Sequence, residues 1–98
     1  MKTLIAVPCF NESQIIIECI ESIQKNFSVN HDILVVNDGS SDNTLAKIQQ
    51  TKVQFILSSK SNFGLSAVFN SILSFAKEYS YDNLIIFDSD MQYPEEQL

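Results

Sequence analysis

The sequence predicts an α/β fold in which four mainly parallel strands alternate with helices that cover both faces of the sheet. Four short apolar runs, at residues 3–7, 32–37, 53–57 and 83–87, are continuous rather than alternating and are rich in Ile, Val and Phe. Such runs are typical of parallel strands buried on both faces. The segments between them have helical periodicity, and right-handed crossovers turn this β-α-β-α-β-α-β order into a layered sheet.

The first helix is predicted by apolar residues at i, i+4, i+7 and i+11, which share one helical face: Ile16, Ile20, Ile23 and Phe27. Asn11 followed three residues later by Gln14 resembles a capping box. We therefore expect the helix to begin just after the first strand.

The second helix is expected to have Ser41 or Asp42 as its N-cap and to turn Leu45 and Ile48 inward. The third is predicted to be a long, well-buried helix. Its apolar stripe consists of Leu65, Val68, Phe69, Ile72, Leu73 and Ala76. Pro94, followed by two glutamates, is typical of the first turn of a fourth helix, so we interpret residues 1–98 as a truncated domain.

Composition limits the function classes. The 98 residues make one small domain at most. Six Lys, no Arg and a formal charge of −6 argue against nucleic acid as a partner. A bound phosphate group would need backbone N–H groups, a lysine or a metal ion. Cys9 and Cys19 are predicted to be reduced core residues.

Membrane insertion and secretion are not predicted. No stretch approaches the roughly 18 apolar residues of a transmembrane helix. The N-terminal apolar run of about five residues is shorter than the ~7–15 residues of a signal-peptide core. The predicted compartment is therefore the cytoplasm.

Polar residues follow each predicted strand, at the sheet edge where open α/β folds bind ligands. They are Asn11 and Glu12, Asn37 and Asp38, residues 58–62, and Asp88 and Asp90. Residues far apart in the sequence are therefore expected to meet along one edge.

Asp88 and Asp90 are candidate metal ligands, because Mg²⁺ typically binds through one or two carboxylates plus substrate phosphates. The alternative is that one aspartate caps a helix and the other is solvated. An EF-hand is excluded because its sixth position, where glycine is required, is Tyr93.

The segment VVNDGSSD at residues 35–42 is a second candidate. Gly39 permits positive φ in a sharp turn, and Asp38 would place an acceptor oxygen at the sheet edge, within reach of a nucleobase N–H. Glycine-rich dinucleotide and P-loop motifs are absent. Phe10, Phe63 and Phe69 are expected in core or rim packing rather than in a stacking platform, with Phe10, at the sheet edge, as the one candidate exception.

Four motifs together resemble the N-terminal, nucleotide-sugar-binding half of family 2, GT-A-type glycosyltransferases, in particular the polyprenyl-phosphate branch that includes the dolichol-phosphate mannosyltransferases. VPCFNE (7–12) is similar to the family's P-x-Y-N-E, and VVNDGSSDNT (35–44) to V-V-D-D-G-S-x-D-x-T. FDSDMQYPEE (87–96) is similar to D-A-D-L-Q-x-P-P-E, and SNFGLSAVFNSILSFA (61–76) to the N-x-G-x-x-x-A helix. The resemblance implies a Rossmann-like GT-A nucleotide-binding half.

The resemblance also implies roles for single residues. Pro8 and Phe10 would line the base pocket, Asp38 would accept from the nucleobase, and Glu12 would help to shape the pocket. The metal site would bind Mn²⁺ or Mg²⁺. Asp90 would be its ligand, Asp88 would reach the ribose and a metal-bound water, and Gln92 would add a contact.

Two positions depart from the family pattern: Asn37 replaces the first Asp of the D-D-G pair, and Phe10 lacks the usual Tyr hydroxyl.

The reaction that the resemblance implies is metal-dependent, inverting transfer from a UDP- or GDP-sugar to a hydroxyl or polyprenyl phosphate. No residue here matches the family's catalytic base. We therefore expect an inactive, donor-binding fragment prone to self-association, from a protein at the cytoplasmic face of a membrane.

Two other functions stay open on the residues alone. One is a Mg²⁺-binding phosphatase or response-regulator-like domain, although such domains normally place their carboxylates after strands one and three. The other is a non-catalytic nucleotide-binding or interaction module.

Overall fold

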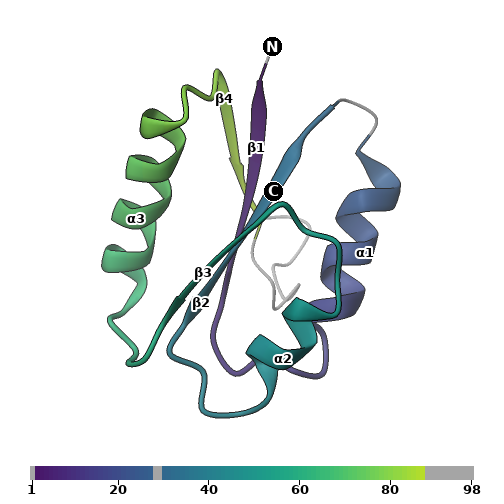
Figure 1. Ribbon diagram of the computed structural model, residues 1–98, viewed down its shortest axis with the longest axis vertical. Helices are drawn as coiled ribbons and strands as arrows, with labels where there is room; N and C mark the ends of the chain where they lie inside the picture. The colour runs from purple at the N-terminus through teal and green to yellow at the C-terminus, as the bar shows by residue number, and fades with distance from the viewer. Residues whose placement is uncertain (1, 28–29, 88–98) are drawn as a thin grey trace, which may run out of the picture.

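The computed structural model describes residues 2–27 and 30–87. Its elements are β1 (Thr3–Cys9), α1 (Ile16–Asn26), β2 (Asp32–Asp38), α2 (Thr44–Gln49), β3 (Phe55–Ser59), α3 (Leu65–Glu78) and β4 (Asn83–Ile86). The predicted alternation of strands and helices is confirmed (Figure 1).

The described strands form one sheet in the order β3-β2-β1-β4, and every pairing is parallel. β1 and β2 pair from Leu4↔Asp32 to Cys9↔Asn37, so both strands end at the same edge. The chain winds outward from β1 to β3 and then returns to place β4 on the other side of β1. Open α/β sheets bind ligands at such a switch point, which here lies at the carboxyl end of β1.

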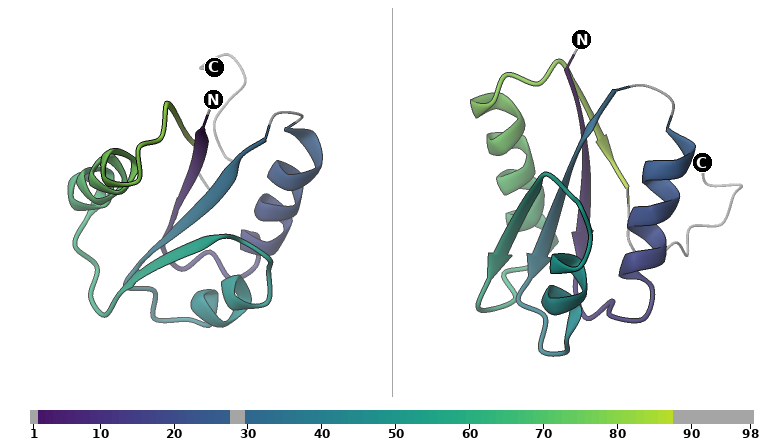
Figure 2. Two further views of the ribbon diagram at one scale, coloured as in Figure 1. Left: turned by 45° about the horizontal axis from the view of Figure 1, so that its top comes forward. Right: turned by 45° about the vertical axis from the view of Figure 1, so that its right-hand side comes forward.

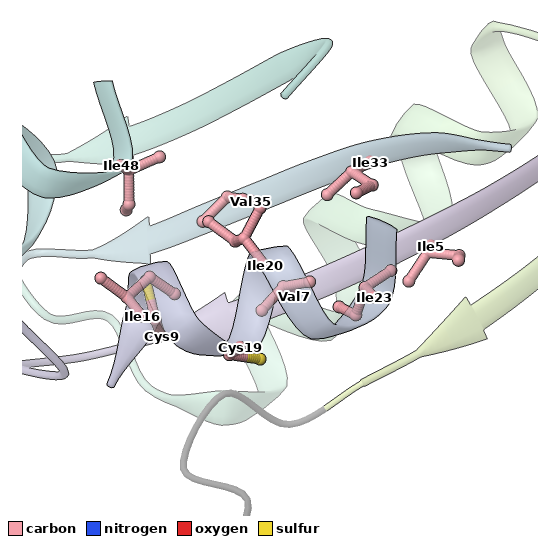
Figure 3. Close-up of a cluster of buried hydrophobic side chains, with 10 residues drawn as sticks. All are labelled: Ile5, Val7, Cys9, Ile16, Cys19, Ile20, Ile23, Ile33, Val35 and Ile48. Atoms are coloured by element: carbon pink, nitrogen blue, oxygen red, sulfur yellow. The ribbon is translucent and has the colours of Figure 1, made fainter. Parts of the chain in front are cut away.

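Helices cover both faces of this sheet, as predicted: α1 and α2 lie on one face and α3 lies on the other (Figure 2). Figure 3 shows the buried cluster beneath α1 and α2, which consists of Ile5, Val7, Cys9, Ile16, Cys19, Ile20, Ile23, Ile33, Val35 and Ile48. The alternate residues of β1 and β2 face α3. Both faces of β1 are covered, which agrees with its continuous apolar run from Leu4 to Cys9.

The predicted inner face of α1 is confirmed. Ile16, Ile20 and Ile23 are buried, and Phe27 packs against the same cluster from the end of the helix. Cys9 and Cys19 are buried and form no disulfide, which confirms that they are reduced core residues. In the described part of the chain, no helix is long and apolar enough to cross a membrane.

The prediction for α3 is only half right. Val68, Ile72 and Ala76 are buried, but Leu65, Leu73 and Phe69 are 61%, 56% and 37% exposed. The six residues form two adjacent i, i+4 rows. A helix that packs on one side against a sheet buries little more than one such row, so the second row remains at the surface.

The outer strands are less buried than predicted. Ile85 and Ile86 of β4 are 36% and 42% exposed, although a strand covered on both faces was expected there. β3 begins at Phe55 rather than Val53, and its residues are half-buried or exposed. Both strands lie at the ends of the order β3-β2-β1-β4, where a sheet has a neighbouring strand on one side only.

The predicted helix starts are wrong. α1 begins at Ile16, without a side-chain cap, so Asn11 and Gln14 form no capping box. α2 begins at Thr44 with Asn43 as N-cap, rather than Ser41 or Asp42. The side chain of Asp42 nevertheless accepts a hydrogen bond from the N–H of Thr44 at 3.0 Å, so Asp42 does stabilise this helix end.

Candidate functional site

A cavity of about 290 Å³, called here the nucleotide pocket, opens at the carboxyl ends of β1 and β2. Its lining is Pro8, Cys9, Phe10, Glu12, Asp38, Asn62, Gly64, Leu65 and Val68. Four of the five residues assigned to nucleotide binding, Pro8, Phe10, Glu12 and Asp38, therefore line one cavity although up to 30 positions separate them in the sequence. The fifth, Asp88, lies outside the described residues.

Asp38 ties the end of β2 to the start of α3. Its Oδ1 accepts a hydrogen bond from the N–H of Phe63 at 2.9 Å, and its Oδ2 accepts one from the N–H of Gly64 at 3.1 Å. Bonds from N–H groups to a carboxylate are stronger than those between neutral groups. The carboxylate also complements the positive end of the α3 dipole. The wall of the pocket between Asn62 and Leu65 is thus held by Asp38.

The turn after Asp38 packs directly on the same wall. Gly39 has φ of +71° and lies against the backbone of Ser61. The side-chain amide of Asn62 donates to the carbonyl oxygen of Asp38 at 3.2 Å. Positive φ and the close approach both require glycine at position 39, as the turn prediction expected.

Asn11 organises the loop that follows β1. It has φ of +51°, and its Oδ1 accepts from the N–H of Ser41 at 2.8 Å. The N–H of the next residue, Glu12, donates to Oγ1 of Thr44 at 3.0 Å. Asn11 therefore connects the loops after β1 and β2, which is why it does not cap α1.

Asn37 is the centre of a second set of bonds along the same edge. This side chain is 3% exposed. Its Nδ2 donates to Oγ of Ser58 at 3.2 Å, and its Oδ1 accepts from Oγ of Ser40. Ser40 Oγ in turn accepts from the N–H of Asn11 at 2.9 Å. A carboxylate at position 37 would lack the donor for the Ser58 oxygen.

Two ionisable groups at this edge have shifted pKa values. Burial, together with a smaller effect of the Glu12 carboxylate, raises the pKa of the Cys9 thiol to about 12. Hydrogen bonds from Thr44 lower the pKa of the Asp42 carboxyl. Cys9 is therefore a protonated thiol in the wall of the pocket, not a nucleophile.

The proposed metal ligands Asp88, Asp90 and Gln92 all lie outside the described residues. Within residues 2–27 and 30–87, no three His, Cys, Asp or Glu side chains gather so that they could hold a metal ion. The last described residue, Phe87, donates its N–H to the carbonyl oxygen of Ala6 at 2.8 Å. The chain thus enters the Asp88-Ser89-Asp90 segment from a position beside β1.

Sequence reasoning missed part of the pocket lining. Leu65 was assigned to the α3 core stripe but lines the pocket and is largely exposed. Phe63 is 67% exposed rather than packed, and it does not line the nucleotide pocket. The N-x-G motif at residues 62–64 was the signal for this wall, and it did not reveal which side chains turn inward.

Comparisons with known proteins agree with the fold. The sequence model of Glycosyl transferase family 2 matches residues 4–98. The chain is 34% identical over 89 residues to the chondroitin synthase of Pasteurella multocida, covering 88% of this chain and 9% of that protein. It is 29% identical over 100 residues to the dolichol-phosphate mannosyltransferase of Pyrococcus furiosus, covering 98% of this chain and 28% of that protein.

A solved structure has the same fold. It is the mannosyltransferase PcManGT from Pyrobaculum calidifontis, in complex with GDP-Man and Mn²⁺, and it superposes with a TM-score of 0.75 at 17% identity. The match covers 97% of this chain and 29% of that one. The chain thus spans less than a third of the length of each of these three proteins.

Proposed function

Because this chain belongs to glycosyl transferase family 2, whose sequence model it matches over residues 4–98, we propose that it forms the donor-binding part of a metal-dependent, inverting glycosyltransferase. A UDP- or GDP-sugar would bind in the nucleotide pocket, and its sugar would pass to a hydroxyl or polyprenyl phosphate. The observation that carries this proposal is the convergence of Pro8, Phe10, Glu12 and Asp38 on one cavity at the carboxyl ends of β1 and β2.

The side chains suit a nucleoside. Phe10, which is 43% exposed at the pocket, offers an aromatic face on which a base stacks, while Pro8 lines the wall beside it. Each carboxylate oxygen of Asp38 accepts one backbone N–H and retains a second lone pair. Asp38 can therefore hold the wall and still accept from a base N–H.

The diphosphate needs a cation from elsewhere. The pocket lining includes two acids, Glu12 and Asp38, and no lysine. The N–H groups of Phe63 and Gly64, just before α3, are already bonded to Asp38. The oxygens of Asp88, Asp90 and Gln92 are of the type that Mn²⁺ or Mg²⁺ prefers. When bound, such an ion neutralises the leaving nucleoside diphosphate.

We further propose that the 98 residues bind the donor without transferring the sugar. The relatives contain more than twice as much additional chain, in which we expect the acceptor site and the catalytic base. A polyprenyl-phosphate acceptor would place the whole protein at the cytoplasmic face of a membrane.

Calorimetry with UDP and GDP tests the proposal. We expect Mn²⁺ and the nucleotide to bind cooperatively, because the ion would draw ligands from both protein and phosphate. Asp90→Ala should abolish the effect of Mn²⁺, and Asn70→Ala, at an exposed position of α3 outside the pocket lining, is the matched control. Equal nucleotide affinity in Mn²⁺ and in EDTA would overturn the metal role. No binding of either nucleotide would overturn the proposed function.

A further inference from the structure

A second cavity of about 290 Å³, called here the outer trough, lies between β3 and the first turns of α3. Buried or half-buried apolar side chains line its inside: Val36, Leu57, Ala67 and Val68. Exposed groups line its outside: Phe63, Ser58 and Ser71. Asp38 and Val68 line both cavities, so the outer trough adjoins the nucleotide pocket across the residue 62–64 wall.

Phe63 gives the trough an aromatic face. Among the large apolar side chains of the described residues it is the most exposed, at 67%. Its backbone is nevertheless fixed, because its N–H donates to Asp38. A large apolar ring that is held at the mouth of a cavity and left open to solvent is typical of a binding surface.

Ser58 gives the trough a hydrogen-bond donor. Ser40 Oγ accepts from the N–H of Asn11, so its own hydrogen goes to Oδ1 of Asn37. That orients the Asn37 amide with its nitrogen toward Ser58, whose oxygen accepts the bond. Within the described residues, no acceptor takes the hydroxyl hydrogen of Ser58, which remains available to a ligand.

Asn37 is what makes this donor available. In the family motif this position is Asp, and a carboxylate there would take the Ser58 hydrogen for itself. The departure from the motif therefore changes the chemistry of the trough while leaving Asp38 in place.

The charge of its lining limits the class of ligand that the trough can bind. No lysine lines the trough, and the Asp38 carboxylate lies in its wall, so an anion is disfavoured. The trough's volume of about 290 Å³, at the lower limit for ligand sites, is enough for one ring. Ser71 donates its hydroxyl hydrogen to the Ala67 carbonyl at 3.0 Å and keeps its oxygen lone pairs for a ligand donor.

We propose that the outer trough binds one uncharged sugar ring, which stacks on Phe63, accepts from Ser58 and donates to Ser71. The apolar face of a sugar ring can stack on the aromatic ring of Phe63. The hydroxyl groups around that ring can accept from the one donor and donate to the one acceptor. The choice of a carbohydrate rests on the proposed function, whereas the geometry of the trough does not. The site would hold a sugar unit in addition to the one carried by the nucleotide.

The test is a titration of the ¹⁵N-labelled chain by two-dimensional NMR, in EDTA and without nucleotide. The ligands are methyl α-mannopyranoside, methyl β-glucopyranoside and N-acetylglucosamine, with uridine and guanosine as competing ring ligands. We expect at least one sugar to bind in the millimolar range and to shift the amides of residues 57–59, 63, 67 and 71. Sugar shifts centred on residues 8–12, no sugar shifts, or trough shifts from nucleosides alone would overturn the proposal.

Variants assign the contacts. Phe63→Ala should weaken sugar binding roughly 5–10-fold, and Ser58→Ala roughly 2–10-fold. Phe69→Ala, which removes an exposed ring of α3 outside the trough, should leave it unchanged. Asn37→Asp should weaken binding as Ser58→Ala does. Unchanged affinity in Phe63→Ala, in a sample whose spectrum shows it to be folded, would overturn the inference.

The same sample separates this inference from the proposed function. A nucleotide titration with Mn²⁺ follows the sugar titration. If sugars bind in the trough and nucleotides do not bind at all, the inference stands and the proposed function fails. If nucleotides bind with Mn²⁺ and sugars do not bind in the trough, the inference fails and the proposed function stands.

Discussion

A β-carbon on Gly39 would lie 2.2 Å from the carbonyl carbon of Ser61. No real pair of carbon atoms without a bond between them approaches so closely, so the turn after β2 rests directly on the loop before α3. With the Asp38 carboxylate on the N–H groups of Phe63 and Gly64, this contact fixes one wall shared by both cavities.

Replacing Gly39 with alanine should therefore be strongly destabilising. Both the positive φ and the backbone clash oppose a side chain, and we expect a loss of about 3 kcal/mol or more in the free energy of unfolding. Gly64→Ala is the matched control: its φ is +92°, but nothing lies within 4 Å of the added β-carbon. Backbone strain alone costs about 1–3 kcal/mol there. Urea denaturation followed by circular dichroism measures both, and equal losses would contradict the close contact.

Asp38→Asn should weaken the hydrogen bonds that hold the same wall while keeping a side chain of the same size. An amide has one acceptor oxygen, and its NH₂ group would face a backbone N–H, so one of the two bonds is lost. We expect a decrease of about 1–3 kcal/mol in the free energy of unfolding and weaker nucleoside binding. The response of binding to Mn²⁺ should persist. Calorimetry at several Mn²⁺ concentrations checks this, and loss of the Mn²⁺ effect with unchanged base selectivity would reverse the assignment of Asp38.

The sheet was predictable because its signal is local. β1 and β2 are buried on both faces, and a continuous apolar run is the only pattern compatible with that burial. The outer strands were less predictable. The run at β4 is as apolar as those of β1 and β2, although Ile85 and Ile86 are exposed in the fold. Which strand lies at an edge depends on the strand order, which the sequence pattern does not contain.

The sequence was enough to predict which residues of the candidate site lie close together. It was not enough to predict their hydrogen-bond partners. Asn11 followed by Gln14 fits a capping box, yet the Asn11 oxygen bonds across the edge to Ser41. Asp38 was assigned to a base, and its bonds to the N–H groups of Phe63 and Gly64 depend on a loop 25 residues later in the chain. Long-range partners of short polar side chains leave no periodic signal in the sequence.

Cys9 should be inert in the folded chain. Burial raises the pKa of its thiol from 9.0 to about 12, so iodoacetamide at pH 8 should modify it only as fast as the chain unfolds. A raised folded-state pKa contributes stability below pH 9 that is lost as the pH rises toward 12. The difference in unfolding free energy between wild type and Cys9→Ala should shrink over that window. Rapid alkylation under native conditions would show that the thiol is accessible.

Asp42 should make the chain sensitive to acid. Hydrogen bonds from Thr44 hold its pKa below the ordinary value of 3.8, so its contribution is present above that pH and is lost as the pH falls through the folded-state pKa. Asp42→Asn should be less stable than wild type at neutral pH, and the two should converge in acid. Glu21→Gln, at an exposed position of α1, is the control. Urea denaturation at a series of pH values gives the comparison, and parallel curves would contradict the role of Asp42.

Self-association should proceed through β4 and the exposed row of α3. Among the described residues β4 pairs only with β1, which leaves the backbone groups of its outer edge as a template for another strand. Ile86 of β4 and Leu73 of α3 are 42% and 56% exposed, so pairing there would also bury apolar surface. Removing one such side chain from the contact costs about 1.5 kcal/mol, which weakens association roughly tenfold.

Sedimentation velocity over a range of concentrations should therefore show a wild-type chain that self-associates, and Ile86→Lys and Leu73→Lys variants that do so less. Ser74→Lys adds the same charge at an exposed polar position of α3 and should behave as wild type. A wild-type chain that stays monomeric at every concentration, or one whose association Ile86→Lys leaves unchanged, would show that this edge is not an interface.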